Sequence, residues 1–253
     1  MKLPSRKLLV PISLLIFLSA ISYVYIKIRH TAFIEQEENN TITISEHNRI
    51  AKEYIDILMK HDNPEEKRRI RIELASLQPP NETLRLVLTY YRDLKDSNTE
   101  EKTQLRSVIS QINPSGHINY FKTIASETDD EPLFVNLVYS LRKAGDNEAK
   151  IALLKLINEN YLGSTGQGLS SIYTSLLDIT DIHDSILLAD FVKKENPSDL
   201  QIQIIAGIAE ANTSAEMLDL LRIIYLHPNS TETKLLIEKN IKEMELKMEQ
   251  AKR

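Results

Sequence analysis

The chain has 253 residues, of which 42% are hydrophobic and 26% charged, a composition typical of a globular protein rather than a disordered one. It contains no cysteine, which excludes disulfides, thiolate metal sites and cysteine nucleophiles. The net charge is -5 and all 36 acidic residues follow residue 29, so no nucleic-acid surface is expected, because phosphate contacts need clustered Lys and Arg.

The chain begins with an apolar segment at 8–26 that contains no charged residue. A helix rises about 1.5 Å per residue, so this segment approaches the ~30 Å thickness of the hydrocarbon core of a bilayer. Basic residues precede it, tyrosines lie near its far end, and Lys27 and Arg29 follow, as is typical of the two interfaces of a membrane-spanning helix. We therefore predict a single transmembrane anchor with basic flanks at 1–29.

A cleaved secretory signal is the alternative, because it also combines a basic start with an apolar centre. Signal cleavage needs small residues at positions −3 and −1, and the best candidate site, after Ala20, has the bulky Leu18 at −3. The anchor is therefore favoured, and the secreted protein stays the alternative. Basic residues are slightly more numerous before the segment than after it, which predicts a cytoplasmic N-terminus and a periplasmic body at a bacterial inner membrane.

A polar juxtamembrane linker is expected at 30–44, and helical periodicity then continues through 45–250. Six glycines and nine prolines are too few for a β-rich protein of this length, which favours helices joined by short turns. Asparagine, aspartate, glycine and proline separate the apolar-periodic stretches, as is typical of helix ends. Helices are expected behind Ser45, Asn63 and Asn81 and then at about 98–112, 115–127, 131–144, 147–161, 168–179, 182–195, 198–211, 214–227 and 230–250.

One stretch of this helical region occurs twice. The sequence NPEEKRRIRIELASLQP at 63–79 is matched by NTEEKTQLRSVISQINP at 98–114, about 35 residues further on. That spacing is the length of two short helices with their turns. A pair of short helices buries its apolar face only against neighbouring pairs, so the echo predicts stacked repeats.

The Asn-Pro turns of the chain carry a resemblance to a known family. The turn at 63–64 is followed by Arg68, and the turn at 196–197 is followed by the apolar run at 204–209. Short amphipathic helix pairs with such a turn before the second helix resemble HEAT-type repeats. The resemblance implies an all-α solenoid of short antiparallel helix pairs over 45–250, with a concave surface that binds partners.

The segment at 163–168 holds half the glycines of the chain. A phosphate-binding loop is one interpretation, but the Gly-Lys-Ser/Thr ending is missing and no strand precedes the segment. We expect instead a flexible break in the solenoid that serves as a hinge.

Two carboxylates and an imidazole come together in sequence at Asp181, His183 and Asp184. A metal site is conceivable from these residue types, but adjacent residues of a helix point in different directions. Asp181 as a helix N-cap, with Asp184 in the first turn, explains the pattern through the helix dipole. The expectation is a helix start and no metal.

The densest basic cluster consists of Lys67, Arg68, Arg69 and Arg71. It is a candidate patch for an acidic partner or for anionic lipid, since it lies near the membrane end in sequence. The alternative is a solvated helix face, in which the flanking glutamates pair with these residues at helical spacing.

No constellation of residues predicts catalysis, a cofactor or a metal, so the chain is not expected to be an enzyme. The expected function is a membrane-anchored helical-repeat scaffold or assembly factor. It would bind other, membrane-associated proteins outside the cytoplasm, and would contact the bilayer through 8–26. An all-α enzyme, whose site is assembled from residues distant in sequence, stays the alternative.

Overall fold

The computed structural model describes residues 44–157 and 166–252. The chain divides into two compact units, Met1–Ile50 and Ala51–Arg253. The second unit begins inside a helix at 44–60 and contains all the elements named below.

The predicted anchor at 8–26 lies outside the described residues, as does almost all of the predicted linker at 30–44. Of the predicted hinge at 163–168, only the last three residues are described. Among the residues that are described, no helix is both long and apolar enough to cross a bilayer.

Every described element is helical, which confirms the prediction of an all-α fold. The helices are short, as expected for a chain in which asparagine, aspartate, glycine and proline recur between the helical stretches. After the helix at 44–60 they are α2 (Pro64–Ser76), α3 (Pro80–Asp93), α4 (Thr99–Ile109), α5 (Ile118–Glu127), α6 (Glu131–Ala144), α7 (Asn147–Leu156), α8 (Gln167–Ile179), the 3-10 turn η2 (Ile182–Asp184), α9 (Ser185–Glu195), α10 (Asp199–Ala211), α11 (Ala215–Ile224) and α12 (Thr231–Gln250).

Local capping chemistry fixes several helix starts at the predicted positions. The Asn63 side chain accepts a hydrogen bond from the Glu65 backbone N–H at 2.9 Å, and Pro64 occupies the first helical position of α2. At α10, Ser198 and Gln201 form a reciprocal capping box. Each such bond satisfies a backbone group that the helix itself leaves unpaired, and is worth about 1 kcal/mol.

Several boundaries differ from the prediction. Ser45 and Asn81 were expected before their helices but lie inside them, because the first helix already includes residue 44 and α3 begins at Pro80. The helix expected at 98–112 is α4, which ends at Ile109.

The expected helix at 115–127 begins only at Ile118, because Gly116 has φ of 77°, a left-handed conformation that interrupts a right-handed helix. The expected helix at 214–227 is α11, which ends at Ile224. Beyond it, the His227 backbone N–H donates to the Ile224 carbonyl at 3.0 Å, so the chain tightens into a turn.

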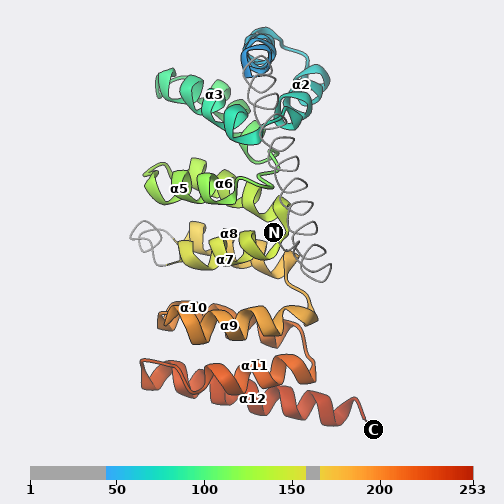
Figure 1. Ribbon diagram of the computed structural model, residues 1–253, viewed down its shortest axis with the longest axis vertical. Helices are drawn as coiled ribbons and strands as arrows, with labels where there is room; N and C mark the ends of the chain where they lie inside the picture. The colour runs from blue at the N-terminus through green and yellow to red at the C-terminus, as the bar shows by residue number, and fades with distance from the viewer. Residues whose placement is uncertain (1–43, 158–165, 253) are drawn as a thin grey trace, which may run out of the picture. The chain divides into compact units, whose positions relative to one another are not determined.

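The helices of the second unit contact one another in two rows (Figure 1). In the even row, each of α2, α4, α6, α8, α10 and α12 contacts the next. In the other row, α5 contacts α7 and α9 contacts α11. Neighbours in sequence connect the rows, and among the described residues each interior even-row helix keeps a narrow exposed face.

The core lies between the rows and is almost wholly apolar. Its largest fully buried side chains include Phe121 on α5 and Phe134 on α6. Burying one such side chain contributes about 1.5–3 kcal/mol, so short helices are stabilised by shared packing more than by their own propensity. The buried Ser140 hydroxyl on α6 donates to the Ile112 carbonyl at 2.7 Å, which satisfies both polar groups.

The two copies of the sequence echo form α2 and α4, which are neighbours in the even row. Lys67 Nζ on α2 donates to Glu100 Oε1 on α4 at 2.7 Å, and the guanidinium of Arg71 donates to Gln104. The copies are not identical in detail, because Asn98 makes no side-chain cap where Asn63 does.

Candidate functional site

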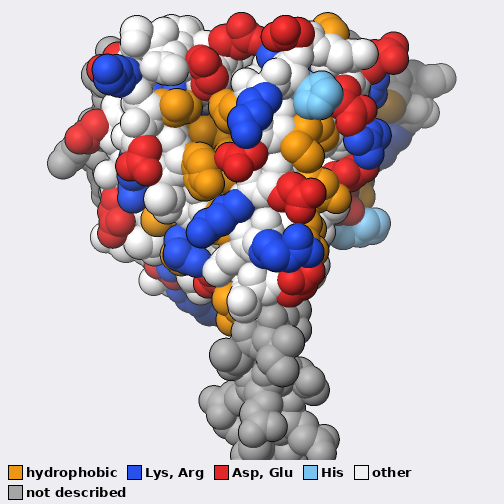
Figure 2. All heavy atoms as spheres, turned by 90° about the horizontal axis from the view of Figure 1, so that it is seen from above, with side chains coloured by type: hydrophobic (Ala, Val, Ile, Leu, Met, Phe, Trp, Pro, Cys, Tyr) orange, Lys and Arg blue, Asp and Glu red, His pale blue; other side chains and the backbone are white. Residues whose placement is uncertain are grey.

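Two of the four members of the predicted basic cluster on α2 form ion pairs with neighbouring acidic groups. Arg69 forms ion pairs with Glu66 and, at 2.9 Å, with Glu73, while Lys67 pairs with Glu100. Arg68 is exposed and forms no ion pair within the described part of the chain. The view onto the end that carries α2 and α3 shows basic side chains interspersed with acidic ones (Figure 2).

Hydrogen bonding within this cluster shifts the pKa of its members. The hydrogen bond from Arg69 lowers the pKa of the Glu66 carboxyl. In the same way, the hydrogen bond from Lys67 and the charge of its ammonium lower the pKa of Glu100. The geometry therefore favours an ion-paired helix face, and binding of an acidic partner or lipid by Lys67, Arg68, Arg69 and Arg71 stays a prediction.

The Asp181–Asp184 motif forms a helix start. The Asp181 carboxylate accepts from the His183 backbone N–H at 2.7 Å, and Asp184 Oδ2 accepts from the Asp181 backbone N–H at 2.8 Å. The two residues thus form a capping box around η2, just before α9. Over residues 44–157 and 166–252, no group of three or more potential ligands is arranged to hold a metal ion.

The structure adds a partner that the sequence did not indicate. Lys150 Nζ, on α7, lies 2.8 Å from both carboxylate oxygens of Asp184. The two side chains are only 9% and 10% exposed, so this is a buried ion pair between α7 and the start of α9. The residues are 34 positions apart, and no local pattern connects them. The one feature of the sequence that indicated a buried partner was Lys150, a lysine within the apolar face of the helix expected at 147–161.

A second buried polar contact joins three helices. The Tyr91 hydroxyl on α3 donates to Asp130, whose other oxygen caps α6 by accepting from the Leu133 backbone N–H at 2.9 Å. Arg106 Nη1 on α4 donates to the same hydroxyl at 3.2 Å. Burial of Tyr91 raises its pKa, and its hydrogen bond to Asp130 raises the pKa further.

The exposed faces of the even-row helices carry polar and tyrosine side chains together with charged ones such as Lys143, Asp178 and Glu210, and the uncharged members are named here the even-row stripe. Its members lie on α6, α8 and α10 and at the C-terminal end of α4, and the single member on α10, Gln203, donates to the Thr233 hydroxyl of α12 at 3.0 Å. The stripe consists of Ser107, Gln111, Asn136, Tyr139, Ser170, Tyr173, Thr174 and Gln203, all exposed or half-exposed.

Two of the eight side chains of the even-row stripe are tyrosines, Tyr139 on α6 and Tyr173 on α8. Tyrosine is enriched at interfaces, because its ring gives a large contact area while its hydroxyl remains satisfied by water or by a partner. The exposed faces of α9 and α11 also carry charges of both signs, among them Lys193, Asp219 and Arg222.

Tyr173 on α8 is held in place by a glycine on α10. A Cβ atom built at Gly207 would meet the Tyr173 hydroxyl oxygen at 3.1 Å and its ring at 3.3 Å. A side chain at Gly207 would therefore require the tyrosine ring to shift by a few tenths of an ångström.

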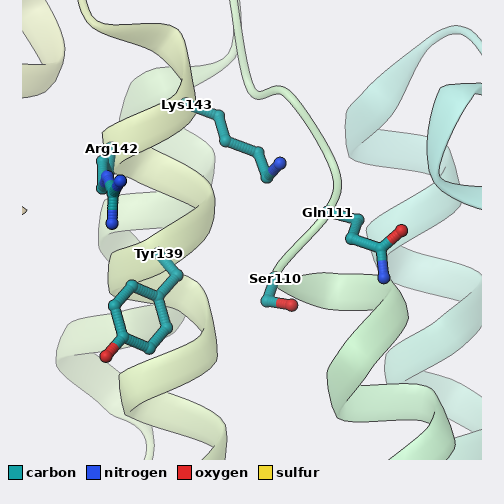
Figure 3. Close-up of a pocket in the computed structure, with 5 residues that line it drawn as sticks. All are labelled: Ser110, Gln111, Tyr139, Arg142 and Lys143. Carbon is teal, nitrogen blue, oxygen red and sulfur yellow. The ribbon is translucent and has the colours of Figure 1, made fainter. Parts of the chain in front are cut away.

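A hollow of about 310 Å³ opens beside the stripe between α4 and α6. Ser110 and Gln111 line it from the end of α4, while Tyr139, Arg142 and Lys143 line it from α6. Figure 3 shows Lys143 extending from α6 toward the side of the hollow where Gln111 lies. The Tyr139 hydroxyl and the Gln111 amide point away from the Lys143 ammonium, so the polar groups of the lining do not converge on one point.

The charges around this hollow are asymmetric. Arg142 Nη1 forms an ion pair with Asp178 Oδ2 of α8 at 2.9 Å, so its charge is shared. The Lys143 ammonium has no ion-pair partner among residues 44–157 and 166–252. The Ser110 hydroxyl already donates to the Ser107 carbonyl at 2.9 Å, which leaves it able only to accept.

Sequence analysis missed this site, although one signal was present. Within the predicted helix at 131–144, the polar residues Asn136, Tyr139 and Lys143 recur at helical spacing among mostly apolar side chains. In a helix so apolar, such a stripe marks the one open side. Its relation to the end of α4 depends on how the two helices pack.

Two further hollows lie along the other row. One, of about 360 Å³, is lined by residues of α5, α7 and α9, among them Lys122, Lys155 and Leu187. The second, of about 310 Å³, lies between α9 and α11 and is lined among others by Ile186 and Glu216. Each mixes apolar groups with charges of both signs, and neither gathers groups that favour one chemistry.

Comparison with protein-family models, with curated proteins and with solved structures finds no match for this chain.

Proposed function

We propose that the chain is a membrane-anchored helical-repeat protein, a HEAT-like α-solenoid, that binds other proteins as a scaffold or assembly factor. The observation that carries the proposal is the even-row stripe. Polar side chains with one tyrosine each lie on the exposed faces of α6 and α8, and further polar side chains lie at the end of α4 and on α10. An extended row of this kind offers many weak contacts along a partner rather than a single deep site.

The proposal includes the topology expected from the sequence. Residues 8–26 form the anchor, the N-terminus is cytoplasmic and the helical body lies on the other side of the membrane. Tethering to a bilayer raises the effective concentration of the body near membrane-associated partners, so modest contacts along the stripe suffice for assembly.

Photo-crosslinking in native membranes tests the binding surface. A photoreactive phenylalanine analogue replaces Tyr139 or Tyr173 in the full-length chain, and crosslinked proteins are identified by mass spectrometry. The same analogue at Ile186, 76% exposed on α9, is the control for non-specific encounter. We expect both stripe positions to crosslink one and the same protein, which also co-purifies with the chain, and the control not to do so.

Either of two results would refute the stripe as the binding surface. One is the absence of any crosslink from both stripe positions although the chain is correctly inserted. The other is equal crosslinking of the same protein from Ile186 and from the stripe.

The absence of cysteine makes the topology directly testable. Single cysteines at Ser5 and at Ser97, an exposed position between α3 and α4, are probed with a membrane-impermeant maleimide. We expect Ser97→Cys to react in intact spheroplasts and Ser5→Cys to react only after lysis. The reverse pattern contradicts the orientation, and a mature chain that starts after Ala20 contradicts the anchor.

A further inference from the structure

We propose that the helical body bends at the boundary between α8 and η2, and that the buried Lys150–Asp184 pair holds this boundary closed. The boundary separates the middle block, α5 to α8, from the C-terminal block, η2 to α12. It follows α8, whereas the segment at 163–168, expected from sequence to act as a hinge, lies at the start of that helix. The inference concerns the chain by itself, so it does not depend on a binding partner.

Helices pack closely within each block but hardly at all between the blocks. In the middle block α5 packs on α6 and α7, and both α6 and α7 pack on α8. In the C-terminal block α11 packs on α9, α10 and α12, and α10 packs on α12. Among the described residues, α8 and α10 are the one helix pair that packs closely across the boundary (Figure 1). The even row therefore continues through the boundary.

The other row is interrupted at the same place. In the described part of the chain, α5 packs on α7 and α9 packs on α11, but α7 and α9 are not a closely packed pair. The hollow of about 360 Å³ that extends from α5 and α7 to Leu187 of α9 lies at this interruption. Bending about the even row would therefore widen or narrow the space between α7 and α9.

The contact between α8 and α10 suits the axis of such a bend. The ring of Tyr173 lies against Gly207, which has no side chain to interlock with it. Ridges of side chains that fill grooves fix the angle between two packed helices, and a glycine leaves its ridge incomplete. The angle between α8 and α10 is thus less firmly fixed here than where large side chains interdigitate.

Polar contacts from α7 close the boundary on the interrupted side. The Lys150 ammonium on α7 lies 2.8 Å from both carboxylate oxygens of Asp184 in η2, and both side chains are buried. Two further contacts join the Leu154 carbonyl to Gln201 Nε2 of α10 at 3.0 Å, and Lys155 to Glu195 of α9 at 3.1 Å. The pair of Lys150 with Asp184 is the buried ionic contact among the three.

A boundary closed in this way opens more readily than one closed by apolar packing. Polar groups that separate exchange each other for water at a small net cost, whereas apolar surface resists exposure in proportion to its area. A buried ion pair also regains the hydration of both charges when it opens. Regions with few buried apolar contacts are those that open first in folded proteins, so the stack should bend here.

Removing one charge of the pair should shift the boundary toward an open form. In Asp184→Asn the Lys150 ammonium keeps its charge but has lost its counter-charge. It gains full hydration only when α7 separates from η2, so the substitution favours the open form over the closed one. Lys150→Gln leaves the opposite charge unpaired and should shift the boundary in the same direction.

Distances between pairs of spin labels test the bend in the full-length chain, measured by pulsed electron paramagnetic resonance in a non-ionic detergent. The absence of cysteine allows two engineered cysteines to carry the labels. One pair, Thr123→Cys on α5 and Ala215→Cys on α11, spans the interrupted row. The matched pair, Lys143→Cys on α6 and Lys242→Cys on α12, spans the even row across the same boundary. All four positions are exposed.

We expect Asp184→Asn and Lys150→Gln to lengthen the α5–α11 distance by at least about 3 Å, one further hydrogen-bond length, as water enters between α7 and η2. The α6–α12 distance should stay constant, because the even row is the axis of the bend. Glu195→Ala removes an exposed ion pair across the same boundary and should change neither distance.

Three results would overturn the inference. The first is an α5–α11 distance that neither Asp184→Asn nor Lys150→Gln changes. The second is equal lengthening of both label pairs, which indicates general loosening of the fold rather than a bend. The third is an equal effect of Glu195→Ala, which shows that the buried pair has no special role. None of these results bears on the proposed binding surface, because no partner is present in the measurement.

Discussion

The buried ion pair between Lys150 and Asp184 gives the sharpest prediction for stability. The Asp184 carboxylate accepts three hydrogen bonds at 2.8 Å, two from Lys150 Nζ and one from the Asp181 backbone N–H. Asp184→Ala removes all three and leaves the ammonium buried without a counter-charge. Removing one partner of a buried pair costs about 3–5 kcal/mol, mostly because the remaining charge stays desolvated.

Two further variants separate charge from hydrogen bonding. Asp184→Asn keeps an oxygen for the Asp181 N–H and for Lys150 but removes the negative charge, so it should cost less than Asp184→Ala. Lys150→Met keeps the apolar stem of the lysine and removes its charge. Combined with Asp184→Asn, it should be less destabilising than the sum of the two single changes, because neither charge is then buried alone.

Urea unfolding of the full-length chain in non-ionic detergent, followed by circular dichroism, measures these differences. Glu195→Ala is the matched control, because Glu195 also joins α9 to α7 through Lys155 at 3.1 Å, but with side chains 43% and 41% exposed. An exposed pair contributes about 0–1 kcal/mol, so the control should be nearly neutral. If Asp184→Ala costs no more than Glu195→Ala, the buried pair does not stabilise the junction and the reasoning fails.

Three other predictions follow from single contacts. Gly207→Ala should change stability by less than about 1 kcal/mol, since the better helix propensity of alanine offsets the steric contact, but should displace Tyr173 and reduce crosslinking from it. Because folding raises the pKa of Tyr91, the protonated hydroxyl stabilises the folded state fully below pH 10. This stabilisation is lost as the pH rises through the higher pKa of the folded state. The difference in unfolding free energy between wild type and Tyr91→Phe should therefore shrink above pH 10, and a constant difference would contradict this. For Glu100 the pH dependence runs the other way, because folding lowers the pKa of its carboxyl. The ionised carboxylate stabilises the folded state above its ordinary pKa of 4.5, and this stabilisation is lost as the pH falls below that value. Lys67→Met should remove this loss of stability, as measured by the free energy of unfolding between pH 3 and 6. If the free energy of unfolding of the variant falls with pH as it does in the wild type, the Lys67–Glu100 pair is not the cause of that loss.

Helix positions were predictable from sequence, because their determinants are local. Asn63 caps α2 through backbone groups two and three residues away, and Ser198 caps α10 in the same way. The capping role expected for Asp181 is also confirmed. Where the prediction was wrong, as at 115–117, the reason was a single backbone conformation at Gly116.

Other expectations from the sequence stay predictions. The anchor at 8–26 and its orientation depend on residues outside the described part of the chain. The scaffold function and the role of the basic cluster on α2 depend on partners, which only binding experiments identify. The HEAT-like character of the repeats rests on two Asn-Pro turns and one sequence echo.

The sequence by itself determined that the described body of this protein is helical and where most of its helices begin and end. Periodicity and capping act within one or two helical turns, so they can be read along the chain. Only the tertiary structure decided which polar groups meet. Lys150 and Asp184 are 34 residues apart, and Tyr91 and Asp130 are 39. The hollow beside Lys143 likewise exists only between two helices. Such contacts depend on the rotation and register of one helix against another, which are set by the packing of the whole core. No local sequence pattern therefore predicts them.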